Sequence, residues 1–244
     1  MSDDLGSYSK KFITDIPMDV NSEYYSYYKS RLYKYPLEGV YIYSFEHGRM
    51  LYADGWENVA GIPDSEITML RIVNMTADEY APFVHEINDK ALQFLHVRNH
   101  RLTEYSFTIE TKIRNSNEED IPVVARVAVH DTFEDGTLRS IIGRFQVDYG
   151  LQFGKIMRYS AYGPEKDEFE RNLNRNLFYP YRISELELNI IRLLAKGHTY
   201  REICNELDKS TSQIERHIDT LLERFKVNNT PSLIAFCYEN RLLP

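Results

Sequence analysis

The sequence predicts an α+β domain built on one antiparallel sheet, followed by an all-α four-helix domain. At 244 residues the chain is longer than the commonest single domain of about 100 to 150 residues. Apolar residues recur with a period of two in the strands predicted within residues 39–150 and with helical spacing throughout residues 182–244. Sequence patterns typical of helix starts also recur in residues 182–244. Two domains of different class therefore follow from spacing alone.

Composition places the chain among ordinary soluble proteins, with 43% hydrophobic and 27% charged residues. No stretch approaches the ~18 consecutive apolar residues that a membrane span needs, and the N-terminus lacks a signal-peptide layout. Two cysteines, Cys204 and Cys237, are too few for a disulfide framework. We therefore expect a cytoplasmic protein with no membrane partner.

Charge is unevenly distributed. The chain has 29 basic and 37 acidic residues, and nine of each kind lie in residues 182–244. The whole acidic excess therefore lies in residues 1–181. A polyanionic partner is usually met by a basic or at least neutral surface, so only the last quarter of the chain suits nucleic acid.

Residues 1–38 contain a run of tyrosines that recurs at three- and four-residue spacing around NSEYYSYYKSRLYKYPL. This predicts an N-terminal helical segment that packs on a neighbour.

Residues 39–150 predict a hairpin, short helices and then three strands in a meander. The turn of the hairpin is His47-Gly48, and the meander turns at residues 115–120 and 133–136. Between hairpin and meander, Tyr80, Phe83, Val84, Ile87 and Leu92 form a helical stripe. One antiparallel sheet with helices over one face results.

This order resembles the PAS sensor domain over about residues 30–150. The stretch GVYIYSFEHGRMLYADGWENVAGIP stands where that family opens, TADEY where its long helix begins, and IIGRFQVDYG in its late strand. The resemblance implies that a small molecule or a protein is detected at the sheet and signalled through a connector, residues 151–181. Candidate cavity residues are Tyr41, Tyr43, Tyr52, Trp56, Met75, Phe83, Phe107, Ile109, Val127 and Phe145. For any one of these, an ordinary place in the core remains the alternative.

The sequence requires no cofactor. Flavin photoreceptors of the PAS type use a cysteine adduct, and both cysteines here lie in residues 182–244. His85 or His96 could serve a haem, although a lone histidine is more often solvated or hydrogen-bonded. Phosphate-binding glycine loops, metal-spaced His/Cys clusters and nucleophile elbows are all missing from the sequence, so an enzyme is not expected.

Residues 182–244 carry four helix starts. Three are capping boxes, in which a hydroxyl at the helix entrance pairs with an acid or amide three residues later: Ser184 with Glu187, Thr199 with Glu202, and Ser210 with Gln213. Thr230-Pro231 marks the fourth start, and Gly197 ends the first helix. The second and third helices are separated by about four residues, the spacing of a helix-turn-helix.

Apolar stripes support each of these helices. They comprise Leu186, Ile190, Leu193 and Leu194; Tyr200, Ile203, Cys204 and Leu207; Ile214, Ile218, Leu221, Leu222 and Phe225; and Ile234, Cys237 and Tyr238. The range resembles the LuxR-type (NarL/FixJ-like) helix-turn-helix over its whole length. The resemblance implies sequence-specific binding of duplex DNA by a homodimer, with the third helix in the major groove.

Helical geometry turns Ser212, Arg216, Asp219, Thr220 and Glu223 away from the core, with Glu215 on one shoulder and Gln213 and His217 on the other. From this face we expect base contacts, and the flanking cations would contact phosphates. The predicted DNA-binding residues are Arg201, Lys209, Ser212, Gln213, Glu215, Arg216, Asp219, Thr220, Arg224 and Lys226.

The acids are the departure from the family, which commonly places lysine where Glu215 stands and often a basic residue where Asp219 stands. Either acid could accept a hydrogen bond from cytosine N4. Alternatively, both belong to a solvated face with (i, i+4) partners. A third alternative makes the chain a protein-interaction adaptor with a degenerate helix-turn-helix.

Overall fold

The computed structural model describes residues 6–174, 181 and 183–243. The chain folds as two compact units. Unit 1 comprises Met1–Leu151 and Met157–Asn174, and unit 2 comprises Gln152–Ile156 and Arg175–Pro244. The predicted N-terminal segment, connector and terminal domain include residues 1–5, 175–180, 182 and 244, which lie outside the described residues.

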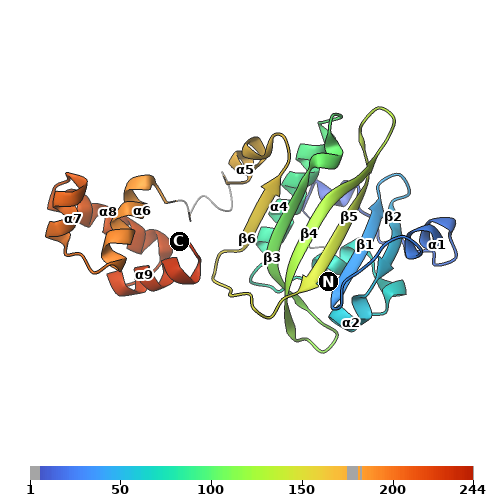
Figure 1. The fold of residues 1–244 in the computed structure, drawn as a ribbon, viewed down its shortest axis with the longest axis horizontal. Coiled ribbons are helices and arrows are strands. Elements are labelled where there is room, and N and C mark those ends of the chain that lie inside the picture. The colour runs from blue at the N-terminus through green and yellow to red at the C-terminus, as the bar shows by residue number, and fades with distance from the viewer. Residues whose placement is uncertain (1–5, 175–180, 182, 244) are drawn as a thin grey trace. The chain divides into compact units, whose positions relative to one another are not determined.

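Unit 1 is built on a six-stranded antiparallel sheet with the strand order β2-β1-β5-β4-β3-β6 (Figure 1). The strands are β1 Glu38–Ser44, β2 Arg49–Asp54, β3 Ser106–Arg114, β4 Asp120–Thr132, β5 Leu138–Val147 and β6 Arg158–Tyr162. The hairpin is β1-β2, and β3, β4 and β5 form the meander. The predicted antiparallel sheet is confirmed.

The sixth strand was missed by sequence analysis. Strand β6 lies within the predicted connector and pairs with the edge of the sheet through β3, from Ser106 opposite Tyr162 to Glu110 opposite Arg158. Its five residues are too short and too polar to show a clear period of two. The helical part of the connector is α5 Lys166–Asn174.

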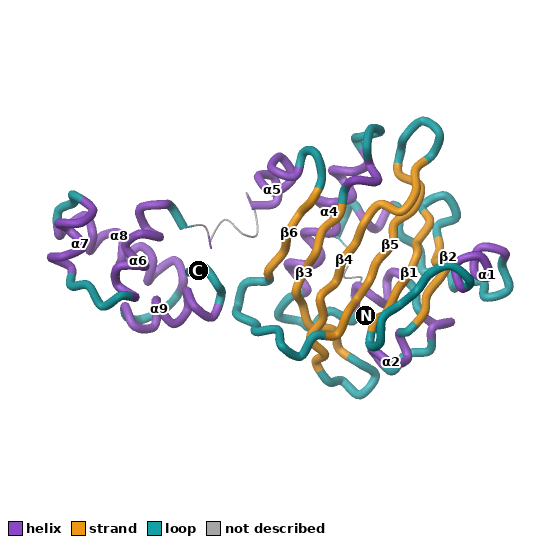
Figure 2. The backbone as a smooth tube through the Cα atoms, in the orientation of Figure 1, coloured by secondary structure: helices purple, strands orange, loops and turns teal. Residues whose placement is uncertain are grey.

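Several helices cover the inner face of the sheet, and the longest of them runs behind the sheet in the orientation of Figures 1 and 2. They are α2 Trp56–Ala60, α3 Met69–Asn74 and α4 Ala81–His96, with 3-10 turns η1 Ser9–Lys11, η2 Asp64–Glu66 and η3 Leu102–Glu104. The predicted stripe of α4 is confirmed, since Phe83, Val84, Ile87 and Leu92 and the preceding Tyr80 are all buried.

The other face of β1 and β2 is covered by α1 Glu23–Lys29. Tyr25 and Tyr28 of this helix, together with Leu32, pack against a buried cluster that includes Ile42 and Tyr52. The tyrosine-rich stretch therefore contains the packing helix that its spacing predicts, although the helix ends at Lys29.

The segment before α1 is fixed to α4 by a buried carboxylate. Asp89 of α4 accepts hydrogen bonds from Ser9 N (2.8 Å), Ser9 Oγ (2.6 Å) and Tyr8 N (3.1 Å). Nearby, Tyr8 Oη lies 3.1 Å from His96 Nδ1, and Phe12 packs edge-on against the same imidazole. Residues 8–12 therefore close one side of unit 1.

Unit 2 contains four helices among its described residues, α6 Glu185–Ala195, α7 Tyr200–Leu207, α8 Thr211–Phe225 and α9 Thr230–Glu239. All three predicted capping boxes are present, and Gly197 follows α6 in the left-handed conformation with a φ of 86°. The fourth helix departs from prediction in two details. Asn229 rather than Thr230 caps α9, because its side chain accepts from Ser232 N. Tyr238 is exposed, whereas Leu233 and Phe236 are buried.

Candidate DNA-binding helix and sensor cavity

Helix α8 projects from a capped turn after α7. Asp208 ends α7 in the left-handed conformation, which aspartate tolerates, and Ser210 caps α8 by accepting from Gln213 N. Ile214, Ile218, Leu221 and Phe225 of α8 are buried, so the opposite side of the helix faces solvent. The turn and the two helices thus have the arrangement that the spacing predicts.

The exposed side of α8 carries six predicted DNA contacts. Ser212, Gln213, Glu215, Arg216, Asp219 and Thr220 are all exposed. Three of them already form local hydrogen bonds. Gln213 Oε1 accepts from Ser210 N at 3.0 Å, Ser212 Oγ lies 3.1 Å from Ser210 Oγ, and Thr220 Oγ1 donates to the Arg216 carbonyl at 2.8 Å. A bidentate contact from Gln213 to adenine would therefore compete with the capping box.

The acids on this face have no neutralising partner. Among the described residues, neither Glu215 nor Asp219 forms an ion pair or a side-chain hydrogen bond. Glu223, one further turn along, is exposed as well. Because residues four apart are neighbours on a helix, Glu215, Asp219 and Glu223 form a line of like charge beside Arg216. The (i, i+4) pairing that would make these acids an ordinary solvated face is not formed.

The flanking cations differ in availability. Arg201 and Lys209 are exposed, and Lys226 is exposed at the C-terminal cap of α8. Arg224 is half-buried instead, and its Nη2 lies 2.9 Å from Glu187 Oε1. The structure therefore ties Arg224 to the capping box of α6 and not to the exposed face.

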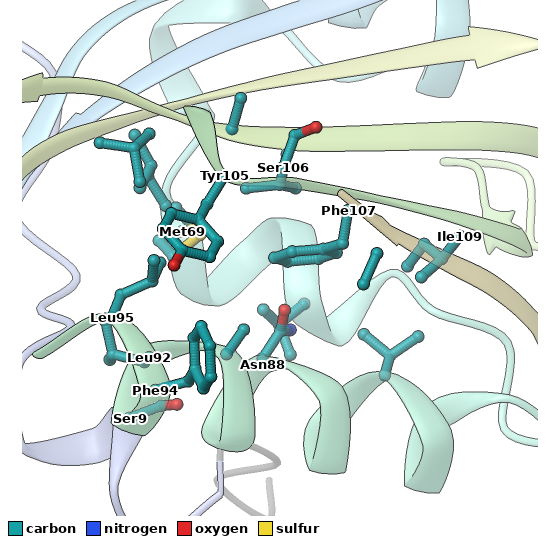
Figure 3. Close-up of a pocket in the computed structure, with 18 of the residues that line it drawn as sticks. Ser9, Met69, Asn88, Leu92, Phe94, Leu95, Tyr105, Ser106, Phe107 and Ile109 are labelled. Atoms are coloured by element: carbon teal, nitrogen blue, oxygen red, sulfur yellow. The ribbon is translucent and has the colours of Figure 1, made fainter. Parts of the chain in front are cut away.

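A cavity of about 100 Å³ lies in unit 1 between the inner face of the sheet and α3, α4 and α5 (Figure 3). Five of the ten predicted residues line it, namely Tyr41, Phe107, Ile109, Val127 and Phe145. Further lining comes from α4, where Leu92, Phe94 and Leu95 project toward the sheet, and from Ser9 and Met69.

The other five predicted residues lie outside this lining. Tyr52 packs on the opposite face, against α1, because it is the cross-strand neighbour of Ile42. Tyr43 Oη bonds to the N-terminal segment, accepting from Thr14 N and donating to the Phe12 carbonyl. Trp56 Nε1 donates to the Val40 carbonyl. Met75 and Phe83 are buried in the core without lining the cavity.

Two parts of the cavity lining lie outside residues 39–150, the range in which the cavity residues were predicted. Ser9 and Ile13 of the N-terminal segment line the cavity, as do Lys166 and Phe169 of α5. Phe169 packs on Phe94 with ring centroids 5.4 Å apart. In the sequence, the one indication of this part of the lining was that the apolar stripe of α4 continues to Leu95.

Neither His85 nor His96 lines the cavity. Burial lowers the pKa of His96, which packs under the N-terminal segment. Within the described ranges, no group of three or more histidine, cysteine or acidic side chains is arranged to hold a metal ion. None of the helices described is long and apolar enough to cross a membrane.

Comparison with known proteins shows which family of domains unit 2 resembles. Residues 182–237 match the model of the luxR family of bacterial regulatory proteins. Unit 2 carries a LuxR-family helix-turn-helix domain. The oxygen regulatory protein NreC of Staphylococcus carnosus is 32% identical over 65 residues, which is 26% of this chain and 30% of NreC. NreC of Staphylococcus aureus strain JH9 is 31% identical over 81 residues, or 32% of this chain and 37% of NreC. The chain thus spans about a third of these curated relatives.

Solved structures resemble the chain more loosely. The phage VqmA–DPO complex has a TM-score of 0.36 at 16% identity and covers 87% of each chain. The Vibrio cholerae VqmA dimer without target DNA has a TM-score of 0.33 at 11% identity, covering 88% of this chain and 86% of that one. The N-terminal domain of a Marinobacter aquaeolei diguanylate cyclase with a PAS/PAC sensor has a TM-score of 0.35 at 12% identity, covering 45% and 94%.

Proposed function

We propose that the chain is a transcription regulator that binds duplex DNA through α8 as a homodimer and senses a signal in the PAS-like unit. The observation that carries the proposal is the exposed face of α8, which presents six polar side chains on a helix that follows a capped turn. Such a helix enters the major groove with its first turns at the base edges.

Each side chain has a role on this face. Arg216 donates to guanine O6 and N7, while Glu215 and Asp219 accept from cytosine N4. Arg201, Lys209 and Lys226 contact phosphates, together with the backbone N–H groups at the start of α8. Arg224 is left out of the interface because it is bonded to Glu187.

The homodimer follows from the size of one contact. A single helix reads only a few base pairs, and a two-fold dimer reads two half-sites about one DNA turn apart. The cavity supplies the means of control, because α5 lines the cavity and is followed in the chain by residues 175–244 of unit 2. A signal bound there changes the population of dimers with correctly spaced helices.

A salt series of selection from a pool of genomic DNA fragments tests the proposal. We expect a palindromic motif, affinity that falls steeply with salt, and loss of the motif with Arg216→Ala. The matched control is Arg192→Ala, which removes the same charge from an exposed position on α6. If Arg192→Ala reduces selection as much as Arg216→Ala, α8 is not the reading element.

A protein-interaction adaptor is the second candidate, and the unpaired line of acids on α8 favours it. Such a surface suits a basic protein partner. If no fragment is enriched at low salt, and a basic partner binds to the wild type but not to Glu215→Gln/Asp219→Asn, the adaptor replaces the regulator.

A further inference from the structure

Neutral polar groups without partners line the cavity of unit 1. The side chains of Tyr41, Thr76, Asn88 and Thr111 form no hydrogen bond with any described residue, and all four contribute to the lining. Buried polar groups in native proteins are normally hydrogen-bonded to protein, water or a ligand. Of the four, Thr111 Oγ1 is fully buried without a partner among the described residues, and it points to a molecule that fills the space.

Thr111 is the most completely buried of the four, with 1% of its surface exposed. It lies on the inner face of β3 between Ile109 and Ile113, and its cross-strand neighbour is Val123. Its Oγ1 has no hydrogen-bond partner in the part of the chain that the structure describes. Valine would fit this apolar position without the cost of an unpaired hydroxyl, so the threonine is better explained by a bond to a bound molecule.

Tyr41 of β1 and Asn88 of α4 both line the space. The Tyr41 ring lies directly on Gly143 of β5, where an added Cβ would come within 2.1 Å of Tyr41 Cε1. Burial raises the pKa of Tyr41, which keeps the phenol protonated and able to donate. Asn88 projects from α4 toward the sheet below Phe107 (Figure 3), and its amide both donates and accepts.

Charge is nearly absent from the lining. Among the described lining residues Lys166 is the sole charged one, and it is exposed at the start of α5. The rest of the described lining is aliphatic, aromatic or neutral polar. A charged ligand would have to leave water without a buried counter-ion, which is strongly unfavourable.

Size gives the last constraint. A cavity of about 100 Å³ is somewhat smaller than the ~150 Å³ engineered cavity that binds benzene. Its volume matches one small ring with its substituents.

We propose that the cavity binds a small uncharged organic molecule, about one ring in size, whose hydrogen-bonding atoms pair with Thr111, Asn88 and Tyr41. This inference rests on the proposed sensor function and names the chemical class of its signal. Carboxylates and ammonium ions of the same shape are disfavoured, because the charged residue of the described lining, Lys166, is exposed and not buried against the ligand.

Three isosteric probes test the class on the full-length protein: benzamide, benzoate and benzylammonium. We expect saturable binding of benzamide at millimolar concentration in ligand-observed NMR and a rise in Tm, with at least about ten-fold weaker binding of the two ions. Equal or tighter binding of either ion, or no saturable binding of benzamide, overturns the proposal.

Thr111→Val separates a binding role from a structural one. We expect the Tm of the ligand-free protein to be unchanged or raised, and benzamide binding to weaken by about 3- to 10-fold, as for one lost hydrogen bond. Thr108→Val is the matched control, because Thr108 belongs to the same strand but its neighbour is Arg126 on the other face. Unchanged benzamide affinity in Thr111→Val, or equal loss in both variants, contradicts the assignment.

DNA selection run in parallel distinguishes the two proposals. If fragments are selected but the charged probes bind as well as benzamide, the ligand class is wrong and the regulator stands. If benzamide binds as expected and no fragment is selected at any salt concentration, the cavity assignment stands and the DNA-binding proposal fails.

Discussion

Arg224 Nη2 lies 2.9 Å from Glu187 Oε1, while Glu187 Oε2 accepts from Ser184 N at 2.7 Å. One carboxylate thus completes the capping box of α6 and holds the C-terminal end of α8. The pair is largely shielded, with 9% of the glutamate side chain and 26% of the arginine side chain exposed. This contact links α8 to α6, and because of it we propose that Arg224 is not one of the phosphate contacts.

Arg224→Met is expected to destabilise unit 2 by about 1 to 3 kcal/mol, because it leaves the Glu187 carboxylate shielded and short of a partner. Chemical denaturation monitored by circular dichroism measures the change. Where the protein is still folded, DNA affinity should fall less than with Arg216→Ala. A larger loss of DNA affinity than with Arg216→Ala, at unchanged stability, would return Arg224 to the interface.

Unit 2 should lose stability in acid. Burial alone raises the pKa of Glu187, but the hydrogen bonds from Ser184 and the Arg224 guanidinium outweigh it, so the pKa lies below the ordinary 4.5. A depressed carboxyl pKa stabilises the fold above the unfolded value and loses that contribution as the pH falls through the folded value. We therefore expect Tm to drop below about pH 4.5, and to drop less in Glu187→Gln. Parallel pH profiles of the two proteins would refute this.

Lys226→Gly should separate stability from DNA affinity. Lys226 caps α8 with a φ of 55°, a conformation that is strained for lysine and free for glycine. We expect stability to be unchanged or up to about 1 kcal/mol higher. The slope of log affinity against log salt should become shallower by about 0.9 if Lys226 contacts one phosphate. An unchanged slope would show that it contacts none.

Neutralising the acids of α8 should strengthen non-specific binding. Glu215→Gln and Asp219→Asn each remove a repulsive charge that no described partner screens. We expect affinity for random duplex DNA to rise about two- to five-fold per substitution, as for a screened interaction of about 0.4 to 1 kcal/mol. Affinity for the selected motif should rise less, or fall, if the acid reads cytosine. Glu239→Gln on α9 is the matched control for net charge, and an equal rise there would exclude a local effect.

Asp89→Ala should release the N-terminal segment. Three donors from Tyr8 and Ser9 lose their acceptor, at a cost of about 1 to 3 kcal/mol. Hydrogen exchange of residues 8–13 should become faster while exchange in β4 and β5 is unchanged. Tyr8→Phe, which removes only the contact to His96 Nδ1, should have a smaller effect. Equal exchange in Asp89→Ala and the wild type would mean that the carboxylate does not hold the segment.

Local patterns specified much of the molecule. Hydroxyl and acid three residues apart predicted the starts of α6, α7 and α8, because a capping box is made within one helical turn. Apolar periodicity predicted the stripe of α4 and the strands β1 to β5, since it reports directly which face is buried. The prediction that Tyr238 belongs to the buried stripe of α9 was wrong. Two alternative stripes on α9 were equally apolar, and contacts with other helices determine which of them is buried.

The cavity shows what the sequence alone could not supply. Tyr41 and Tyr52 both stand in strands of the predicted hairpin, yet register puts one on the inner face and the other against α1. A shift of one residue exchanges the faces, so register decides which side chains meet a ligand. Ser9 and Phe169, far apart in sequence, line the same space only because η1 and α5 both pack around α4.

The sequence by itself determined the helices of unit 2, the caps of α6, α7 and α8, and the strands β1 to β5 of unit 1, because these depend on neighbours within a turn or a strand. Only the tertiary structure assigned Arg224 to Glu187, added β6 to the sheet and gathered Thr111, Asn88 and Tyr41 around one cavity. Those outcomes depend on contacts between residues distant in the chain, which no local spacing encodes.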